Sequence, residues 1–411
     1  ANSAFATTVM AGFFPTFFRQ FWSTGAESSL TTFRLGMANA AAGFAIALLA
    51  PLLGAVADRG GHRKAFLLGW SLLGIGMTFA LYFVQQGNWA LAATLFALAT
   101  MGFNGGIVFY DSLLLDVARP EDYDRVSSLG YSLGYLGGGV LFAINILMVV
   151  KPGLFGLAGP AEAVRLSFLT VAIWWLVFMM PLLLYVPERA SGKKRPGGSL
   201  LVAGWSELLA TARDLRGKRP LLMFLAAYWL YIDGVNTVIK MAVDFGLALG
   251  LDSTDLLGAL LMTQFIAFPA ALAFGKLGGR IGARDAVLLG LVVYVLLTVW
   301  AYFLTTALGF YLMAGLVGLV QGGVQSLSRS LFGRLVPEGK SAEYFGFYNM
   351  VGKFGTVLGP LLMGGAALAF GSTRASILAL LVLFVGGALL LSRVRFEPGQ
   401  PASSQAAGSS R

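Results

Sequence analysis

The sequence predicts an all-α membrane protein with about twelve transmembrane helices in two pseudo-symmetric six-helix bundles. Of its 411 residues, 57% are hydrophobic and only 12% are charged, whereas soluble domains are about 25% charged. The apolar runs are long and continuous, and two motifs recur about half a chain apart. In lipid the backbone satisfies its polar groups only in helices or closed barrels. Continuous rather than alternating apolar runs therefore favour helices.

Twelve apolar runs are long enough to cross a bilayer, because a span needs about 20 residues. We predict the spans at 1–21, 35–57, 65–84, 89–117, 126–150, 165–186, 220–243, 254–275, 286–306, 309–334, 343–370 and 373–393. The 54 glycines fit this interpretation, since small residues let helices approach closely in lipid. The first run is already apolar at Ala1, so we expect a leader that this sequence does not include.

The distribution of Lys and Arg predicts that both termini are cytoplasmic. Twenty-one of these 29 residues fall in the loops and tail of one side, five on the other side and three inside spans. Cytoplasmic loops carry the excess of Lys and Arg. We therefore expect a multi-pass protein of the cell inner (cytoplasmic) membrane. The same distribution explains the net charge of +10 without a nucleic-acid partner.

Four regions follow from these runs. We predict an N-terminal bundle at 1–186, a cytoplasmic linker at 187–219, a C-terminal bundle at 220–394 and a disordered tail at 395–411. Apolar linker residues share one helical face, which predicts an amphipathic helix at the membrane surface: Leu201, Trp205, Leu208, Ala212 and Leu215. We interpret the linker as a tether between the halves rather than a regulatory segment.

Two stretches of the first half recur in the second. Gly54–Lys64 aligns with Gly275–Arg284 at an offset of 221, and Gly105–Glu121 aligns with Gly322–Glu338 at an offset of 217. Two parallel halves related about the membrane normal form a transporter architecture.

The first repeat resembles the signature loop of the major facilitator superfamily, Gly-x-x-x-Asp-Arg-x-Gly-x-Arg-Lys, between the second and third helices. The resemblance covers essentially the whole chain. It implies a monomer in which helices 1, 4, 7 and 10 line a central cavity. In the motif, Gly54 permits close packing and Gly61 a sharp turn. Asp58 can accept hydrogen bonds from the N-terminus of a facing helix, which the resemblance identifies as the eleventh.

This loop predicts a gating latch at the inner side. Arg59 and Arg63 can pair with acids at the inner end of helix 4, Asp116 or Glu121. Three further basic residues complete the predicted gating region: Arg125, Arg280 and Arg284. The second repeat has Gly279 in place of Asp58, so its latch is expected to be weaker. The alternative is a basic loop that only fixes topology.

A closer resemblance is to the vacuolar-effluxer-like branch, also called the unknown major facilitator family. It rests on Ala1–Thr8, Arg125–Gly138, Ser328–Phe332 and Glu343–Phe354. In that branch an acid and an aromatic residue precede the Ala-Asn-Ser, so they would precede Ala1. Fungal members export amino acids from the vacuole, which makes amino acids a candidate solute.

Ionisable residues inside spans are costly and are therefore functional candidates. On helix 7, Asp233, Asn236 and Lys240 share one face. The other candidates lie on helices 1, 4, 10 and 11: Asn2, Tyr110, Asp111, Gln325, Arg329, Asn349 and Lys353. Asp111 and Arg329 lie at similar depth, so they pair as an inner gate or Arg329 holds a substrate carboxylate. Asp233 can carry a proton, because burial favours the neutral carboxylic acid. For each residue the alternative is a structural ion pair.

Aromatic residues concentrate in the first span. Their spacing predicts a lipid-facing surface with an interfacial anchor rather than a ligand cage: Phe13, Phe14, Phe17, Phe18 and Trp22.

These features predict a secondary transporter that works by alternating access, driven by proton or substrate gradients. Three bases and two acids inside the spans favour a zwitterionic or anionic, amino acid-like solute. The alternatives are a translocator of a lipid or cell-wall fragment, a drug or metabolite exporter, and a non-transporting receptor.

Other classes of protein fit poorly. With no Cys and one His, His62, the chain lacks the means for a thiolate or histidine metal site or a clustered nucleophile and base. No Gly-x-x-x-x-Gly-Lys-Ser/Thr motif is present, so ATP is not the driver. We expect no cofactor and no enzymatic activity. The expected partners are a small solute, the bilayer and protons.

Overall fold

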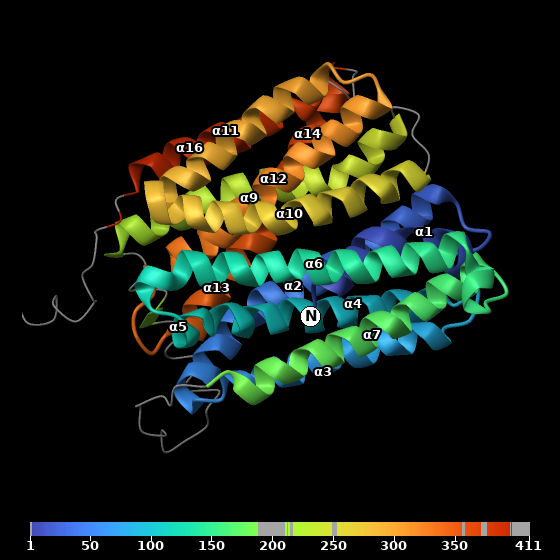
Figure 1. Ribbon diagram of the computed structural model, residues 1–411, viewed down its shortest axis with the longest axis horizontal. Helices are drawn as coiled ribbons and strands as arrows, with labels where there is room; N and C mark the ends of the chain where they lie inside the picture. The colour runs from blue at the N-terminus through green and yellow to red at the C-terminus, as the bar shows by residue number, and fades with distance from the viewer. Residues whose placement is uncertain are drawn as a thin grey trace, which may run out of the picture.

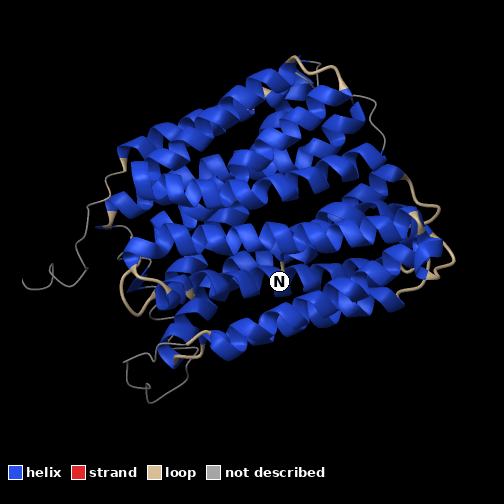
Figure 2. Ribbon diagram, viewed as in Figure 1, coloured by secondary structure: helices blue, strands red, loops and turns tan. Residues whose placement is uncertain are grey.

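The computed structural model describes residues 2–187, 217–248, 253–355, 358–370 and 376–394, with positions 210, 211, 213 and 396. Within these residues the secondary structure is helical and contains no strand (Figure 2). The predicted amphipathic linker helix and the tail lie almost wholly outside the described residues.

The first half contains five long helices and a divided first span. The long helices are α2 (Ser28–Gly60), α3 (Arg63–Ala80), α4 (Trp89–Ser112), α6 (Tyr123–Val150) and α7 (Pro160–Tyr185). The first span consists of the π-helix η1 (Phe5–Phe13), the short α1 (Phe14–Phe17) and the π-helix η2 (Phe18–Trp22). Short turns extend or connect these helices: η3 (Leu81–Phe83), α5 (Leu114–Val117), η4 (Pro120–Asp122) and η5 (Pro152–Phe155).

The described residues of the second half form four long helices followed by three shorter ones. The long helices are α9 (Arg219–Ala248), α10 (Ser253–Ile281), α11 (Ala283–Tyr302) and α12 (Ala307–Gly333). The predicted eleventh span is divided into α13 (Ser341–Phe354) and α14 (Leu358–Phe370), and the twelfth contains α16 (Leu380–Arg393). Among the described residues, nine helices are long and apolar enough to cross a membrane. They coincide with nine of the predicted spans, and the divided first, divided eleventh and short twelfth spans complete the twelve-span architecture.

The two halves lie side by side as separate bundles (Figure 1). Each half has its own large cluster of buried apolar residues. Two helix pairs make the largest contacts between the halves, α6 with α10 and α2 with α13, and α6 with α12 and α4 with α13 make smaller ones. The internal repeat relates α2 to α10 and α6 to α13, so the two pairs are the same contact viewed from each half.

Glycines bring these helices unusually close. A Cβ atom on Gly54 of α2 would lie 2.3 Å from the carbonyl oxygen of Ala342 on α13. A Cβ atom on Gly275 of α10 would lie 2.7 Å from the Cβ of Ser128 on α6. The repeated glycine therefore serves the same purpose in both halves, which is close backbone approach.

The aromatic residues of the first span do not face lipid, so that prediction is wrong. Phe14, Phe18 and Trp22 are 0% exposed, and Phe13 and Phe17 are buried as well. Phe14 stacks on Phe96 of α4 at 3.9 Å between ring centroids. The prediction assumed regular α-helical turns, whereas η1 and η2 are π-helical and the aromatic rings bury a large area inside the first bundle.

Candidate functional site: a charged closure between the halves

Asp58 connects the end of α2 to the beginning of α13 in the other half. Its Oδ1 accepts a hydrogen bond from the backbone N–H of Ala342 at 3.1 Å, and its Oδ2 accepts one from Glu343 at 2.9 Å. The first N–H groups of a helix have no partner inside the helix, and the helix dipole favours an anion there. α2 ends shortly after Asp58, at Gly60, and the next residue, Gly61, adopts the left-handed conformation with φ 63°.

Arg63, the first residue of α3, lies beside this cap and is 8% exposed. It donates a hydrogen bond to Ser341 Oγ, and its Nη2 lies 3.0 Å from Asp116 Oδ2. Its Nε lies 3.8 Å from Asp58 Oδ1. Of the two acids suggested by the sequence, Asp116 is therefore the partner of Arg63.

The other members of the predicted gating region lie towards the surface. Glu121 is 3.9 Å from Arg119, and both side chains are largely exposed, which makes the pair energetically weak. Arg59 is half-buried at the end of α2, and Arg125 and Arg280 are exposed. Arg284 binds within its own half, 2.9 Å from Asp285 and 3.3 Å from the carbonyl oxygen of Val394.

A second connection between the halves is centred on Arg329 of α12, which is 3% exposed. Its Nη1 lies 3.0 Å from Oδ1 of Asp111 on α4. The guanidinium also donates to Ser127 of α6, from Nε to Oγ at 2.9 Å and from Nη2 to the carbonyl oxygen at 3.0 Å. Asp111 Oδ2 in turn accepts from Asn349 of α13 at 3.2 Å. One buried ion pair thus joins four helices, two from each half.

Tyrosine rings surround this ion pair. The Arg329 guanidinium lies 4.7 Å from the ring centroid of Tyr131 and 5.3 Å from that of Tyr110, within the range of cation–π attraction. In the second half, the rings of Tyr228 and Tyr348 stack at 4.2 Å. Lys353, half-buried in the last turn of α13, adds a positive charge that interacts with Asp111.

A third connection between the halves was not predicted from the sequence. Asp124 of α6 forms a bidentate pair with Arg334 at the end of α12, with both Nη–Oδ distances 2.9 Å. Asp124 also accepts a hydrogen bond from Ser330. Both charged residues lie at the edge of a predicted span, 126–150 and 309–334, so neither stood out as a charge inside the membrane. One sequence signal was available. The 217-residue offset of the repeat aligns Asp124 with Ser341, the first residue of α13.

The structure places Asp233 apart from these connections. It lies on α9, is 0% exposed, and binds the start of α14 in its own half. Its Oδ2 accepts from the N–H of Leu358 at 2.8 Å, and its Oδ1 accepts from that of Gly359 at 3.1 Å. Thr237 donates to the same carboxylate at 3.3 Å. Asp233 is therefore arranged like Asp58, but it holds two elements of one half.

The remaining candidates are distributed along the interface and α9. Gln325 accepts a hydrogen bond from Tyr135 of α6 at 2.8 Å. Asn2 precedes η1, where the neighbouring Ser3 lies against Gly134 of α6. Asn236 is half-buried on α9. The side chain of Lys240, the third residue of the predicted α9 face, lies outside the described residues.

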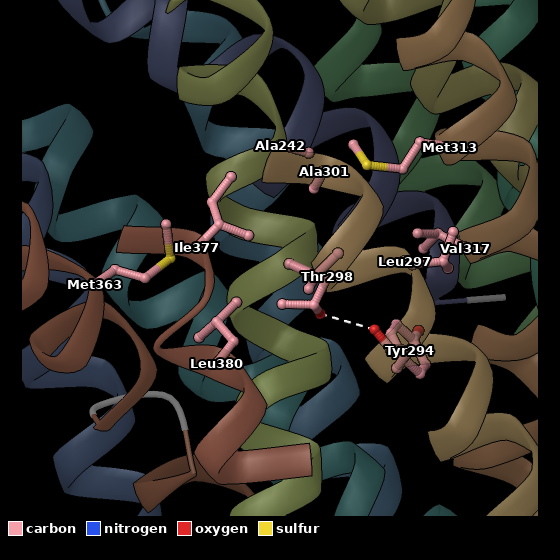
Figure 3. Close-up of a pocket in the computed structure, with 11 residues that line it drawn as sticks. Ala242, Tyr294, Leu297, Thr298, Ala301, Met313, Val317, Met363, Ile377 and Leu380 are labelled. Atoms are coloured by element: carbon pink, nitrogen blue, oxygen red, sulfur yellow. Dashed lines mark hydrogen bonds between the residues drawn. The ribbon is translucent and has the colours of Figure 1, made fainter. Parts of the chain in front are cut away.

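Two pockets lie in the second half, and among the described residues neither has a charged side chain in its lining. The first has a volume of about 50 Å³ and is lined mainly by apolar side chains such as Leu297, Met313 and Ile377 (Figure 3). The second, of about 70 Å³, includes the polar residues Thr263, Gln264 and Gln321.

Comparison with known families agrees with this architecture. The model of a family described as vacuole effluxer Atg22-like matches residues 25–122 and 117–404, which together make up most of the chain.

Two curated relatives illustrate the range of similarity. An uncharacterized MFS-type transporter of Bacillus subtilis (strain 168), YxiO, is 36% identical over 407 residues, covering 98% of this chain and 95% of that protein. Autophagy-related protein 22 of Yarrowia lipolytica is 29% identical over 311 residues, covering 67% of this chain and 51% of that protein. This chain thus spans about half the length of that fungal relative.

Solved structures share the fold at low sequence identity. The proton:xylose symporter XylE superposes with a TM-score of 0.72 at 14% identity, covering 96% of this chain and 93% of that one. The human organic anion transporter MFSD10 gives 0.65 at 16% identity, covering 95% and 96%. Both proteins are transporters. At these sequence identities the two structures establish the fold alone.

Proposed function

Because this chain belongs to the Atg22-like vacuole effluxer family of the major facilitator superfamily, we propose that it is a secondary transporter of a small zwitterionic or anionic solute. The halves rock about a site between them, as in other transporters built from two repeats. We assign the end of the bundle that carries Asp58 to the cytoplasmic side, on the basis of its Lys and Arg content. The described conformation is closed at that end.

The observation that carries the proposal is the buried pair of Asp111 and Arg329. Its two members belong to opposite halves and lie 3.0 Å apart. Separating the halves leaves a carboxylate and a guanidinium without each other, and an unpaired buried charge is strongly unfavourable. A zwitterion supplies a carboxylate for Arg329 and an ammonium group for Asp111. An amino acid-like solute therefore replaces both lost partners at once.

The three connections act together as the cytoplasmic gate. The contacts of Asp58 and Arg63 with the start of α13, of Asp111 with Arg329, and of Asp124 with Arg334 all cross between the halves at the same end. A rigid-body rotation that opens this end must break all three sets of contacts. Solute binding at Asp111 and Arg329 offsets the loss of one set, which couples occupancy of the site to opening.

For energy coupling, the structure favours Asp111 over Asp233. Asp111 exchanges its partner when the halves separate, so its protonation can follow the transport cycle. The contacts of Asp233 lie within one half and are retained during a rigid-body rotation. We therefore assign Asp233 to holding α14 in place.

Counterflow in proteoliposomes tests the proposal. Protein reconstituted with unlabelled L-alanine, L-leucine or L-glutamate inside is given the ¹⁴C-labelled compound outside. We expect saturable uptake of at least one of them, its loss in Arg329→Gln, and its retention in Arg284→Gln, a basic residue bound within one half. Absence of saturable uptake for the whole set, or full activity of Arg329→Gln, contradicts the proposal.

A further inference from the structure

The second pocket lies inside the C-terminal half, between α9, α10 and α12, and we call it the glutamine pocket. Its walls are mostly apolar, and its polar residues are Thr263, Gln264 and Gln321. The Thr263 hydroxyl already donates to the carbonyl oxygens of Ala259 and Ala314, at 2.9 and 3.2 Å. The two carboxamides are therefore the groups that can bind a solute.

Both carboxamides lie on the side of the pocket that faces the first half. Gln264 lies against α6, where a Cβ atom on Gly139 would be 3.2 Å from the Gln264 Cβ. Gln321 is 8% exposed and interacts with Tyr135 of α6. Burying a carboxamide inside a membrane protein is costly, and apolar residues would pack this position at lower cost. A polar pathway along α6 explains why Gln264 and Gln321 are present.

That pathway continues to the charged pair. Gln321, Gln325 and Arg329 are spaced four residues apart and therefore follow one face of α12. On α6 the facing residues, Tyr135, Tyr131 and Ser127, have the same spacing. Gln321 and Arg329 are eight residues apart, which is about 12 Å along the helix. One small solute cannot contact both ends, so the pocket and the ion pair are separate sites.

We infer that the glutamine pocket is a first binding site for the uncharged part of the transported solute, and that Gln264 and Gln321 determine the size it accepts. The inference rests on the proposed function, because it concerns the same solute. The pocket volume of about 70 Å³ has room for on the order of five water-sized groups. It therefore takes the small body of an amino acid-like solute before the charged head reaches Arg329.

The absence of native cysteine gives a direct occupancy test. Ala314→Cys places a thiol in the glutamine pocket, and Ala301→Cys places one in the pocket of Figure 3. Each variant in proteoliposomes is treated with a small methanethiosulfonate reagent, with and without L-alanine or L-leucine. With the solute at a concentration of about ten times its KM, we expect the reaction of Ala314→Cys to slow about ten-fold, as simple occupancy requires. The reaction of Ala301→Cys should not change.

A selectivity measurement complements the labelling. In Gln264→Ala and Gln321→Ala we expect KM for L-alanine to rise with little change in turnover. We also expect the preference for L-phenylalanine over L-alanine to increase about ten-fold, a typical effect of changing pocket size. Thr298→Ala, in the pocket of Figure 3, is the matched control.

The outcomes separate the two proposals. Transport by the wild type without protection of Ala314→Cys, and with unchanged KM and size preference in the glutamine variants, overturns the glutamine pocket alone. Protection of Ala314→Cys by a solute that shows no counterflow supports the pocket and overturns the proposed transport of that solute. Absence of both protection and counterflow overturns both.

Discussion

At the residue scale, the closure is the set of contacts that Asp58, Asp111 and Asp124 make with the second half. It depends on buried charges that have partners in the opposite half. Asp124 is 6% exposed and binds both Nη atoms of Arg334. Arg329 is bound by a carboxylate, a hydroxyl and a carbonyl oxygen. Charge-assisted, bidentate hydrogen bonds of this kind are the strong ones, whereas the exposed pair of Arg119 and Glu121 contributes little. Stability of the closed state is therefore concentrated in a few side chains.

Exchanging the charges of Asp124 and Arg334 tests their pairing. Asp124→Arg and Arg334→Asp each place like charges against one another, and breaking a buried pair costs about 3–5 kcal/mol. We expect each single variant to favour opening at this end and to lose most counterflow, and the double variant to recover much of it. Because the chain has no native cysteine, a single cysteine is introduced at Ala342, which is 0% exposed. Its reaction with a methanethiosulfonate reagent measures thiol accessibility at the closure, and counterflow is measured beside it. A double variant no better than either single variant contradicts a direct pair.

Asp58→Asn tests the cap across the halves. The amide keeps one oxygen acceptor and replaces the other with a donor, which faces an N–H group. Leaving a buried N–H without its acceptor costs about 1–3 kcal/mol, and this cost applies only to the closed state. We expect greater thiol accessibility at the closure with little change in Tm. A large fall in Tm with unchanged accessibility would assign Asp58 to folding rather than gating.

At the element scale, the divided eleventh span shows how far the sequence could be interpreted. Its total length and hydropathy predicted a span at 343–370, and the signature loop predicted the contact of Asp58 with its beginning. The division into α13 and α14 was not predicted, although Pro360 in the first turn of α14 marks it, because the length and hydropathy of 343–370 were interpreted as one continuous span. Without the second helix start, the role of Asp233 as its cap could not be inferred, and Asp233 was assigned to proton transfer instead.

Asp233→Asn therefore has a structural expectation. The new amide nitrogen must face an N–H group of Leu358 or Gly359, so the start of α14 loses one acceptor. We expect a lower Tm and reduced yield, by the same mechanism as for a lost helix cap, which costs about 0.5–2 kcal/mol. Thermal unfolding in detergent measures this directly. An unchanged Tm together with selective loss of proton-driven uptake would restore Asp233 to the coupling role.

Close helix contact at the signature loop gives a prediction for α2. In Gly54→Ala the added Cβ must displace the Ala342 backbone, which lies 2.3 Å from its position. We expect α2 and α13 to separate, with increased thiol accessibility at the closure and reduced counterflow. Gly279→Ala is the control, because its Cβ meets no atom within 4 Å. Equal behaviour of the two variants would show that close packing at Gly54 is unimportant.

At the scale of the whole molecule, the twelve-span architecture was predictable because run length and hydropathy are read directly from the sequence. The pair of Asp111 and Arg329 was predictable as well, since equal depth on helices of opposite halves places them together. Other features depended on geometry that spacing does not reveal. The π-helical turns rotate the aromatic residues of the first span inward, and the ends of spans hide Asp124 and Arg334 among loop residues.

The two main contacts between the halves are similarly extensive but differ in chemistry. The α6–α10 contact continues from Ser128 and Gly275 to Gly139 and Gln264, a length of about 16 Å along α6. It is joined mainly by small side chains and by neutral bonds such as that from Ser132 to the carbonyl oxygen of Phe268. Such a seam can tilt without exposing a charge. Resistance to rotation is therefore concentrated at the cytoplasmic end, where Asp58 of α2, Asp111 of α4 and Asp124 of α6 all bind the second half and must be released together.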